Sequence, residues 1–269
     1  MKERSAIAAL AIEDFPFSEW LQPPPLIENP TDGSLMVLVP GGAFRAGEDG
    51  SSNVDLPAFY LGIHPVTNLQ FFQFAKSAGC SKTGVGWHKG KYPKRQESHP
   101  IMISDFEDAE AYCVWAGLRL PRELEWEKAA RALDGRKYPW GNDQRMGNGR
   151  EVFPKSTSPG WQDPLGCSPW GLYGMCGNIR EWCGAWDRQQ PLASFKGGGL
   201  HAGQTGQHHA RSRDWIIHAM VTGKLIIGAL TPESLSGFAF RVARNLASQN
   251  TLDTLHSTLN LPPPTHNRT

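Results

Sequence analysis

This sequence lacks an excess of either charge, and it also lacks any long apolar run. Its 27 Lys and Arg residues stand against 26 Asp and Glu, which leaves a formal net charge of +1. That balance gives no general attraction to nucleic acid or to an acidic membrane, so we expect neither as a partner. No apolar stretch approaches the length of a membrane span. We do not expect the segment from Met1 to Ile12 to be a signal peptide, because Glu3 interrupts its charged part and Glu13 follows at once. We therefore expect a cytoplasmic protein.

Cysteine is scarce and shows no pairing pattern. The five cysteines are odd in number, form no C-x-x-C pair and have no zinc-ligand spacing. Cys113 falls within a helical pattern, where a cysteine is more often a small buried hydrophobe than a reactive thiol. No cysteine follows Cys183.

Glycine, proline and tryptophan are abundant, with 29, 21 and 10 residues respectively. Many glycines beside many aromatic rings indicate long ordered loops held by ring packing rather than long regular elements. The extreme case is the stretch from Trp170 to Trp186, W-G-L-Y-G-M-C-G-N-I-R-E-W-C-G-A-W. It fits neither an amphipathic helix nor an alternating strand, so we expect an irregular buried core around a tight turn.

That turn offers a possible metal site. Gly177, Ile179 and Glu181 could direct two backbone carbonyls and one carboxylate to a common point, and oxygen-only ligation suits calcium. The alternative, favoured slightly by the residues alone, is that Glu181 pairs with a nearby arginine or accepts from backbone N–H groups.

Regular elements are predicted mainly in the first half of the chain. Residues 35–39 predict a strand, residues 43–47 its hairpin partner, and residues 57–63 another strand. Thr67 is a good N-cap for a helix that ends near Gly79. Residues 104–107 read as a capping box, S-x-x-E, before a second helix. A third helix follows Pro121. Its early glutamates are expected to serve as cap and ion-pair residues rather than general acids; they are Glu123, Glu125 and Glu127.

Five short motifs in register resemble the formylglycine-generating enzyme, or sulfatase-modifying factor, family. They are M-V-L-V-P-G-G-A-F from Met36, P-V-T-N from Pro65, R-L-P-R-E-L-E-W-E-K-A-A-R from Arg119 with Y-P-W-G-N behind it, G-L-Y-G-M-C-G-N-I-R-E-W from Gly171, and K-G-G from Lys196 with G-F-A-F-R from Gly237. The resemblance implies an α+β domain of the C-type-lectin-like kind with little regular secondary structure. We expect an N-terminal arm at 1–34, the domain at 35–244, and a tail at 245–269 that is disordered.

The resemblance does not extend to the family's oxidase chemistry. In those oxidases two cysteines shortly after the G-G-S segment bind copper, a site that suits soft Cu(I). By register, Ala202 and Gln207 stand in their places here, so we expect no copper. Of the family's calcium-binding turn, Gly177, Ile179 and Glu181 match and Gly174 replaces a side-chain ligand, which implies at most a weak structural calcium site.

Three functions remain open. The first is a non-catalytic domain that binds an unidentified protein or small ligand, in its narrowest form a retroelement-diversified variable protein with its binding surface near residues 200–236. Candidate binding residues in that window are His201, Gln204, Gln207, His208, His209, Arg213, Trp215 and His218. The second is a metal-dependent oxidoreductase, with non-haem iron or copper, that uses histidines in place of the cysteine pair. The third is a scaffold domain that meets its partner through residues 15–25, although those aromatic residues more simply cover the domain itself.

Overall fold

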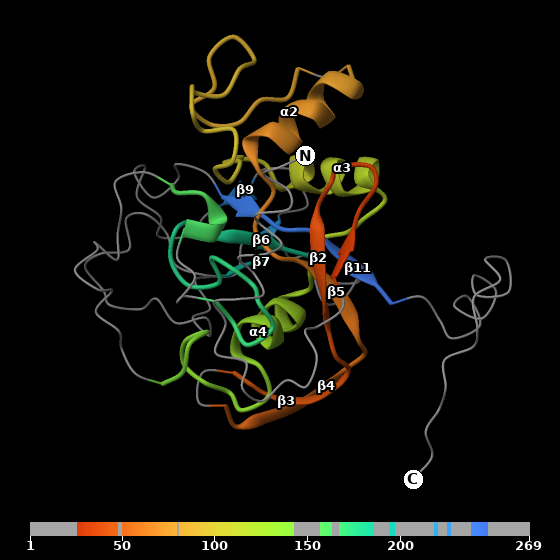
Figure 1. The fold of residues 1–269 in the computed structure, drawn as a ribbon, viewed down its shortest axis with the longest axis vertical. Coiled ribbons are helices and arrows are strands. Elements are labelled where there is room, and N and C mark those ends of the chain that lie inside the picture. The colour runs from red at the N-terminus through yellow and green to blue at the C-terminus, as the bar shows by residue number, and fades with distance from the viewer. Residues whose placement is uncertain are drawn as a thin grey trace, which may run out of the picture.

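A four-stranded antiparallel sheet forms the frame of the chain, in the order β1-β2-β5-β11 (Figure 1). The strands are β1 (Leu26–Glu28), β2 (Leu35–Val39), β5 (Phe59–Gly62) and β11 (Ala243–Asn245). In this computed structural model the described residues are 26–47, 50–79, 81–142, 157–162, 167–184, 194–196, 218–219, 225–226 and 238–246. The sheet joins the two ends of the domain, because β11 pairs with β5 and places Ala243 opposite Leu61.

A second sheet has the order β10-β6-β7. It contains β10 (Ala239–Phe240), β6 (Glu181–Cys183) and β7 (Ser194–Lys196), with β10 parallel and β7 antiparallel to β6. Two hairpins complete the strands. The first pairs β3 (Gly42–Ala46) with β4 (Ser52–Leu56), and the second pairs β8 (His218–Ala219) with β9 (Leu225–Ile226).

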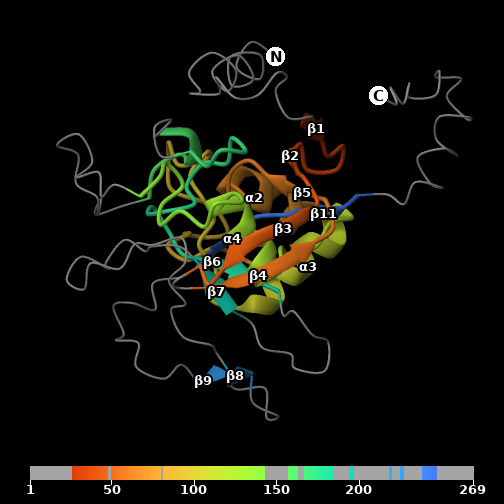
Figure 2. The same cartoon turned by 90° about the horizontal axis from the view of Figure 1, so that it is seen from below.

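Three helices pack against this frame, and Figure 2 shows them from below. They are α2 (Asn68–Ser77), α3 (Phe106–Ala116) and α4 (Glu123–Arg131), and a 3-10 turn η1 spans Gly160–Gln162. Met36 lies in the apolar cluster with α2 and α3, whereas its neighbours Val37 and Val39 lie in the cluster with α4. Because successive residues of a strand face opposite sides, the helices cover opposite faces of the first sheet. No described helix is long and apolar enough to span a bilayer.

Several local predictions are confirmed. The strand at 35–39 has the predicted bounds, and Thr67 caps α2 in a reciprocal capping box with Gln70. Glu125 pairs with Arg119, and Glu127 pairs with Arg131, as ion-pair residues at the start of α4. Cys113 is buried, 2% exposed, and burial raises the pKa of its thiol.

Three local predictions differ from the structure. Residues 42–46 pair with β4 instead of β2, because a strand of matching length begins at Ser52. Asp105, not Ser104, is the N-cap of α3, and it makes no side-chain capping hydrogen bond. Part of the predicted arm also belongs to the fold, since β1 pairs with β2.

The turn between β1 and β2 holds a buried cluster of hydrogen-bonded polar side chains. The carboxylate of Asp32, 5% exposed, accepts hydrogen bonds from Asn29 Nδ2, Ser34 Oγ and Tyr112 Oη, each at 2.7 Å. A buried carboxylate needs such donors to offset its lost hydration. The predicted boundary at residue 34 therefore lies inside the fold.

Candidate functional site

The candidate site lies at the end of the second sheet, where β7 ends before residue 197 and Phe238 leads into β10. β7 ends at Lys196, opposite Glu181. The chain re-enters at Phe238, whose N–H donates to Ile103 O at 2.9 Å, and the next N–H, of Ala239, donates to Arg180 O at 2.8 Å. Both ends of the segment that carries the predicted binding residues are thus fixed beside the turn at 177–181.

Glu181, the predicted metal carboxylate, forms the central ion pair of this region. Arg241 Nε donates to Glu181 Oε2 and Arg241 Nη2 donates to Oε1, both at 2.6 Å, and neither side chain is exposed to solvent. Trp126 Nε1 also donates to Oε2 at 3.0 Å. The alternative in which Glu181 pairs with an arginine is therefore confirmed.

Arg241 connects three parts of the chain through its remaining N–H groups. Nη1 donates to Gly62 O at 3.0 Å and Nη2 donates to Tyr173 O at 2.9 Å. The guanidinium thus joins β5, the aromatic stretch and β6 at one buried point. The planar fork of arginine suits such a bidentate pair, whereas lysine could not make the same set of bonds.

The predicted calcium turn has a tight backbone. Gly177 has φ +103 and Asn178 has φ +60, and Ile179 N–H donates back to Gly177 O at 2.8 Å. Because both oxygens of Glu181 already accept hydrogen bonds, a calcium ion bound by Gly177, Ile179 and Glu181 would share the carboxylate with Arg241. Calcium at this turn stays a prediction.

Asn178 attaches a separate segment, residues 157–162, to the turn. Its Oδ1 accepts from Ser158 N–H and its Nδ2 donates to Ser158 O, both at 2.9 Å. Asparagine tolerates the left-handed backbone better than other side chains. The pattern G-N at the centre of the motif was visible in the sequence, but the partner twenty residues away was not.

Two histidines flank the same segment. The His64 ring packs edge-on against Trp161 with centroids 5.7 Å apart, and His99 Nδ1 lies 3.0 Å from Thr157 Oγ1. His64 Nδ1 lies 2.9 Å from Pro65 O, and because that carbonyl only accepts, Nδ1 carries the proton and Nε2 has the lone pair. Burial lowers the pKa of both imidazoles. Sequence reasoning gave neither histidine a role.

Most of the predicted binding residues lie outside the described residues. These are His201, Gln204, Gln207, His208, His209, Arg213 and Trp215, together with Ala202 at the first cysteine-equivalent position. His218 is described only as part of the backbone of β8, which pairs with β9. In the part of the chain that is described, no group of three or more His, Cys, Asp or Glu side chains could hold a metal ion.

Comparisons with known proteins give a consistent family and fold. The family described as "Sulfatase-modifying factor enzyme 1-like domain" matches residues 24–246. The chain is 32% identical to the formylglycine-generating enzyme of Thermomonospora curvata over 216 residues, 56% of this chain and 71% of that protein. It is 33% identical to the serine/threonine-protein kinase Pkn1 of Chlamydia trachomatis, over 62% of this chain and 30% of the kinase. It is also 29% identical to the hercynine oxygenase of Mycolicibacterium smegmatis, over 59% of this chain and 49% of that protein. The chain thus spans less than a third of the kinase and about half of the oxygenase.

Two solved structures share the fold. PvdO from Pseudomonas aeruginosa matches with a TM-score of 0.61 and 20% identity, over 84% of this chain and all of that one. Variable protein 1 of Treponema denticola matches with a TM-score of 0.60 and 16% identity, over 82% of this chain and 99% of that one. The predicted α+β, C-type-lectin-like fold is confirmed.

Proposed function

This chain belongs to the family of sulfatase-modifying factor enzyme 1-like domains, and from that membership we propose that it is a non-catalytic domain that binds a protein or small ligand. The observation that carries the proposal is the loss of both cysteines at the register of the family's copper site, where Ala202 and Gln207 stand. The described part of the chain keeps the fold.

The cysteines present elsewhere do not fit a copper site. Of the described cysteines, Cys113, Cys167 and Cys183 are at most 8% exposed, and Cys176 is half-buried. Copper(I) in the family's oxidases needs two thiolates from one short segment, together with a thiol substrate that can reach them. Among the described cysteines only Cys176 is not buried, so they offer no pair of accessible thiolates, and we derive no oxidative step through copper.

The proposed binding surface is the segment near residues 200–236. Its two ends are fixed at Lys196 and Phe238 beside a buried ion pair, which gives the segment between them a rigid base. Binding residues are often found in such loops, carried by a scaffold that does not change. A narrower version makes the chain a retroelement-diversified variable protein, and the shared fold with Treponema variable protein 1 supports the scaffold part of that version.

A metal-dependent oxidoreductase is the second candidate. The observation in its favour is the 29% identity with a hercynine oxygenase, combined with His201, His208 and His209 in the segment that replaces the cysteines. Neutral imidazole is a common ligand for iron, copper and zinc. Adjacent histidines in an extended segment face opposite sides, which places His208 and His209 poorly for one ion.

Metal analysis of protein purified without chelators separates the two candidates. We expect no stoichiometric iron, copper or zinc in the wild type. The His201→Ala/His208→Ala variant tests the alternative, and His88→Ala, on an exposed loop, is the matched control. A transition metal present in the wild type and the control but lost in the double variant would replace the binding proposal with the oxidoreductase.

A further inference from the structure

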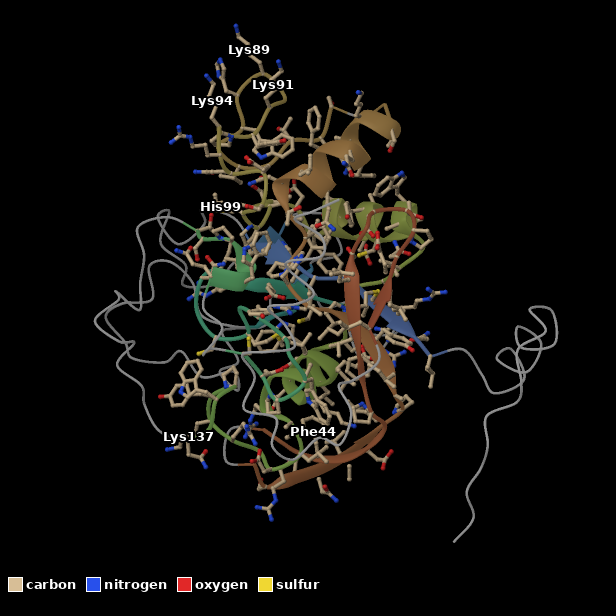
Figure 3. The ribbon with its side chains drawn as sticks, in the orientation of Figure 1. Phe44, Lys89, Lys91, Lys94, His99 and Lys137 are labelled. Atoms are coloured by element: carbon tan, nitrogen blue, oxygen red, sulfur yellow. The ribbon has the colours of Figure 1, made fainter. Side chains whose placement is uncertain are left out.

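The loop between α2 and α3 concentrates positive charge on a protein that is nearly neutral. Five cationic side chains and no acidic one occur between Lys82 and Gln96, while the whole chain carries +1. Lys82 pairs with Asp108 and is neutralised. The other four are exposed, and none of them forms a salt bridge with a described residue; they are Lys89, Lys91, Lys94 and Arg95. Figure 3 shows Lys89, Lys91 and Lys94 pointing away from the body at the tip of this loop, with His99 nearer its base.

The tip of the loop is a tight turn closed by backbone hydrogen bonds. His88 and Lys91 exchange backbone hydrogen bonds of 2.9 and 3.1 Å, and both residues between them have positive φ, +51 for Lys89 and +71 for Gly90. Such a turn normally takes Asn, Asp or Gly at its first central position. Arg95 also has a positive φ, +63. Two cationic side chains therefore occupy backbone conformations that are costly for them, a feature that tends to mark functional loops.

Aromatic packing holds the turn to α2. Trp87 and Tyr92 flank the tip with ring centroids 5.6 Å apart, and both contact Phe72, at 6.2 and 5.8 Å. Trp87 Nε1 donates to Asn68 Oδ1 at 2.9 Å, and Asn68 Nδ2 donates to Gln96 O at 2.8 Å. The loop is thus pre-organised, so it would lose little conformational entropy when a partner binds it.

From this cluster we infer that the loop tip, Lys89, Lys91, Lys94 and Arg95, is a docking surface for an acidic polypeptide segment of another protein. Four cations on one short, fixed tip match a short run of carboxylates. Single-stranded nucleic acid fits less well, because Trp87 and Tyr92 pack against each other and Phe72 instead of presenting open faces to bases. The near-neutral chain also has no general excess of positive charge to attract a phosphate backbone. The surface is separate in sequence from residues 200–236, and the inference stands or falls without them.

Fluorescence anisotropy with a labelled poly-glutamate peptide tests the inference on the full chain. The loop variant carries Lys89→Gln, Lys91→Gln, Lys94→Gln and Arg95→Gln. The matched control removes four exposed cations elsewhere, through Arg45→Gln, Lys76→Gln, Lys137→Gln and Arg244→Gln. Both variants have the same net charge, and their thermal melts verify that each is folded.

We expect the peptide to bind the wild type and the control variant alike at low salt, and the loop variant about tenfold more weakly, given the modest energy of each exposed charge pair. Binding should weaken as added salt shortens the screening length. The inference is overturned if the loop variant and the control bind equally, or if the wild type does not bind the peptide. Tighter binding of a labelled oligonucleotide than of the peptide would replace the acidic polypeptide with nucleic acid.

Discussion

The Glu181→Gln substitution tests the ion pair at the centre of the fold. It keeps the size of the side chain but removes its charge, while Arg241 stays in place with both partners 0% exposed. The new amide oxygen can still accept hydrogen bonds, yet in either orientation the NH₂ group faces at least one N–H donor of Arg241. A buried guanidinium would therefore be left without its counter-charge.

The expected loss is large for a single substitution. Removing one partner of a buried ion pair costs about 3–5 kcal/mol, which is a sizeable part of the roughly 5–15 kcal/mol that holds a typical domain together. For a chain of this size about 1 kcal/mol shifts the melting temperature by roughly 2–4 °C, so we expect a fall of about 6–20 °C.

Thermal melts and urea unfolding of both proteins measure this loss. The matched control is Asp134→Asn, which breaks the pair with Arg136 where Asp134 is 58% exposed, and it should cost less than about 1 kcal/mol. The double variant Glu181→Leu/Arg241→Met should be less destabilised than the sum of its single substitutions, because no charge is left unpaired. Equal melting temperatures for Glu181→Gln and Asp134→Asn would refute the reasoning.

Three further expectations concern the same region. Asn178→Ala should cost about 2–4 kcal/mol in urea unfolding, from two lost hydrogen bonds and a strained φ of +60, and Asn178→Gly about half of that; a larger loss in the glycine variant would contradict the account. Burial lowers the pKa of His64 below 6.5, so the folded protein binds fewer protons than the unfolded chain, and stability should be full above that pH and fall below it. His64→Gln should weaken the dependence of the melting temperature on pH, and His88→Gln should not. An unchanged pH dependence in His64→Gln would contradict the assignment to His64. Calcium bound by Gly177, Ile179 and Glu181 predicts a lower melting temperature in EGTA, restored by added calcium, and no change in EGTA would remove the site.

Local features of the fold were readable from the sequence because they depend on neighbouring residues. The continuous apolar run at residues 35–39 and the Thr67 capping box each encode their element within a few positions. The hairpin partner predicted for residues 43–47 was wrong, since the strand at 52–56 that pairs with them was not predicted from the sequence. The predicted N-cap of α3 was wrong by one residue, because Ser104 and Asp105 are both good caps.

The sequence by itself determined the family, through five motifs in register, and the absence of the copper-binding cysteine pair, because both depend only on which residues stand in which order. The tertiary structure alone decided the role of Glu181. Its partner Arg241 lies 60 positions away, and no local spacing predicts a pair of that kind. Once β6 and β10 lie side by side in a water-free interior, a lone carboxylate is too costly to keep, and the nearest guanidinium must neutralise it.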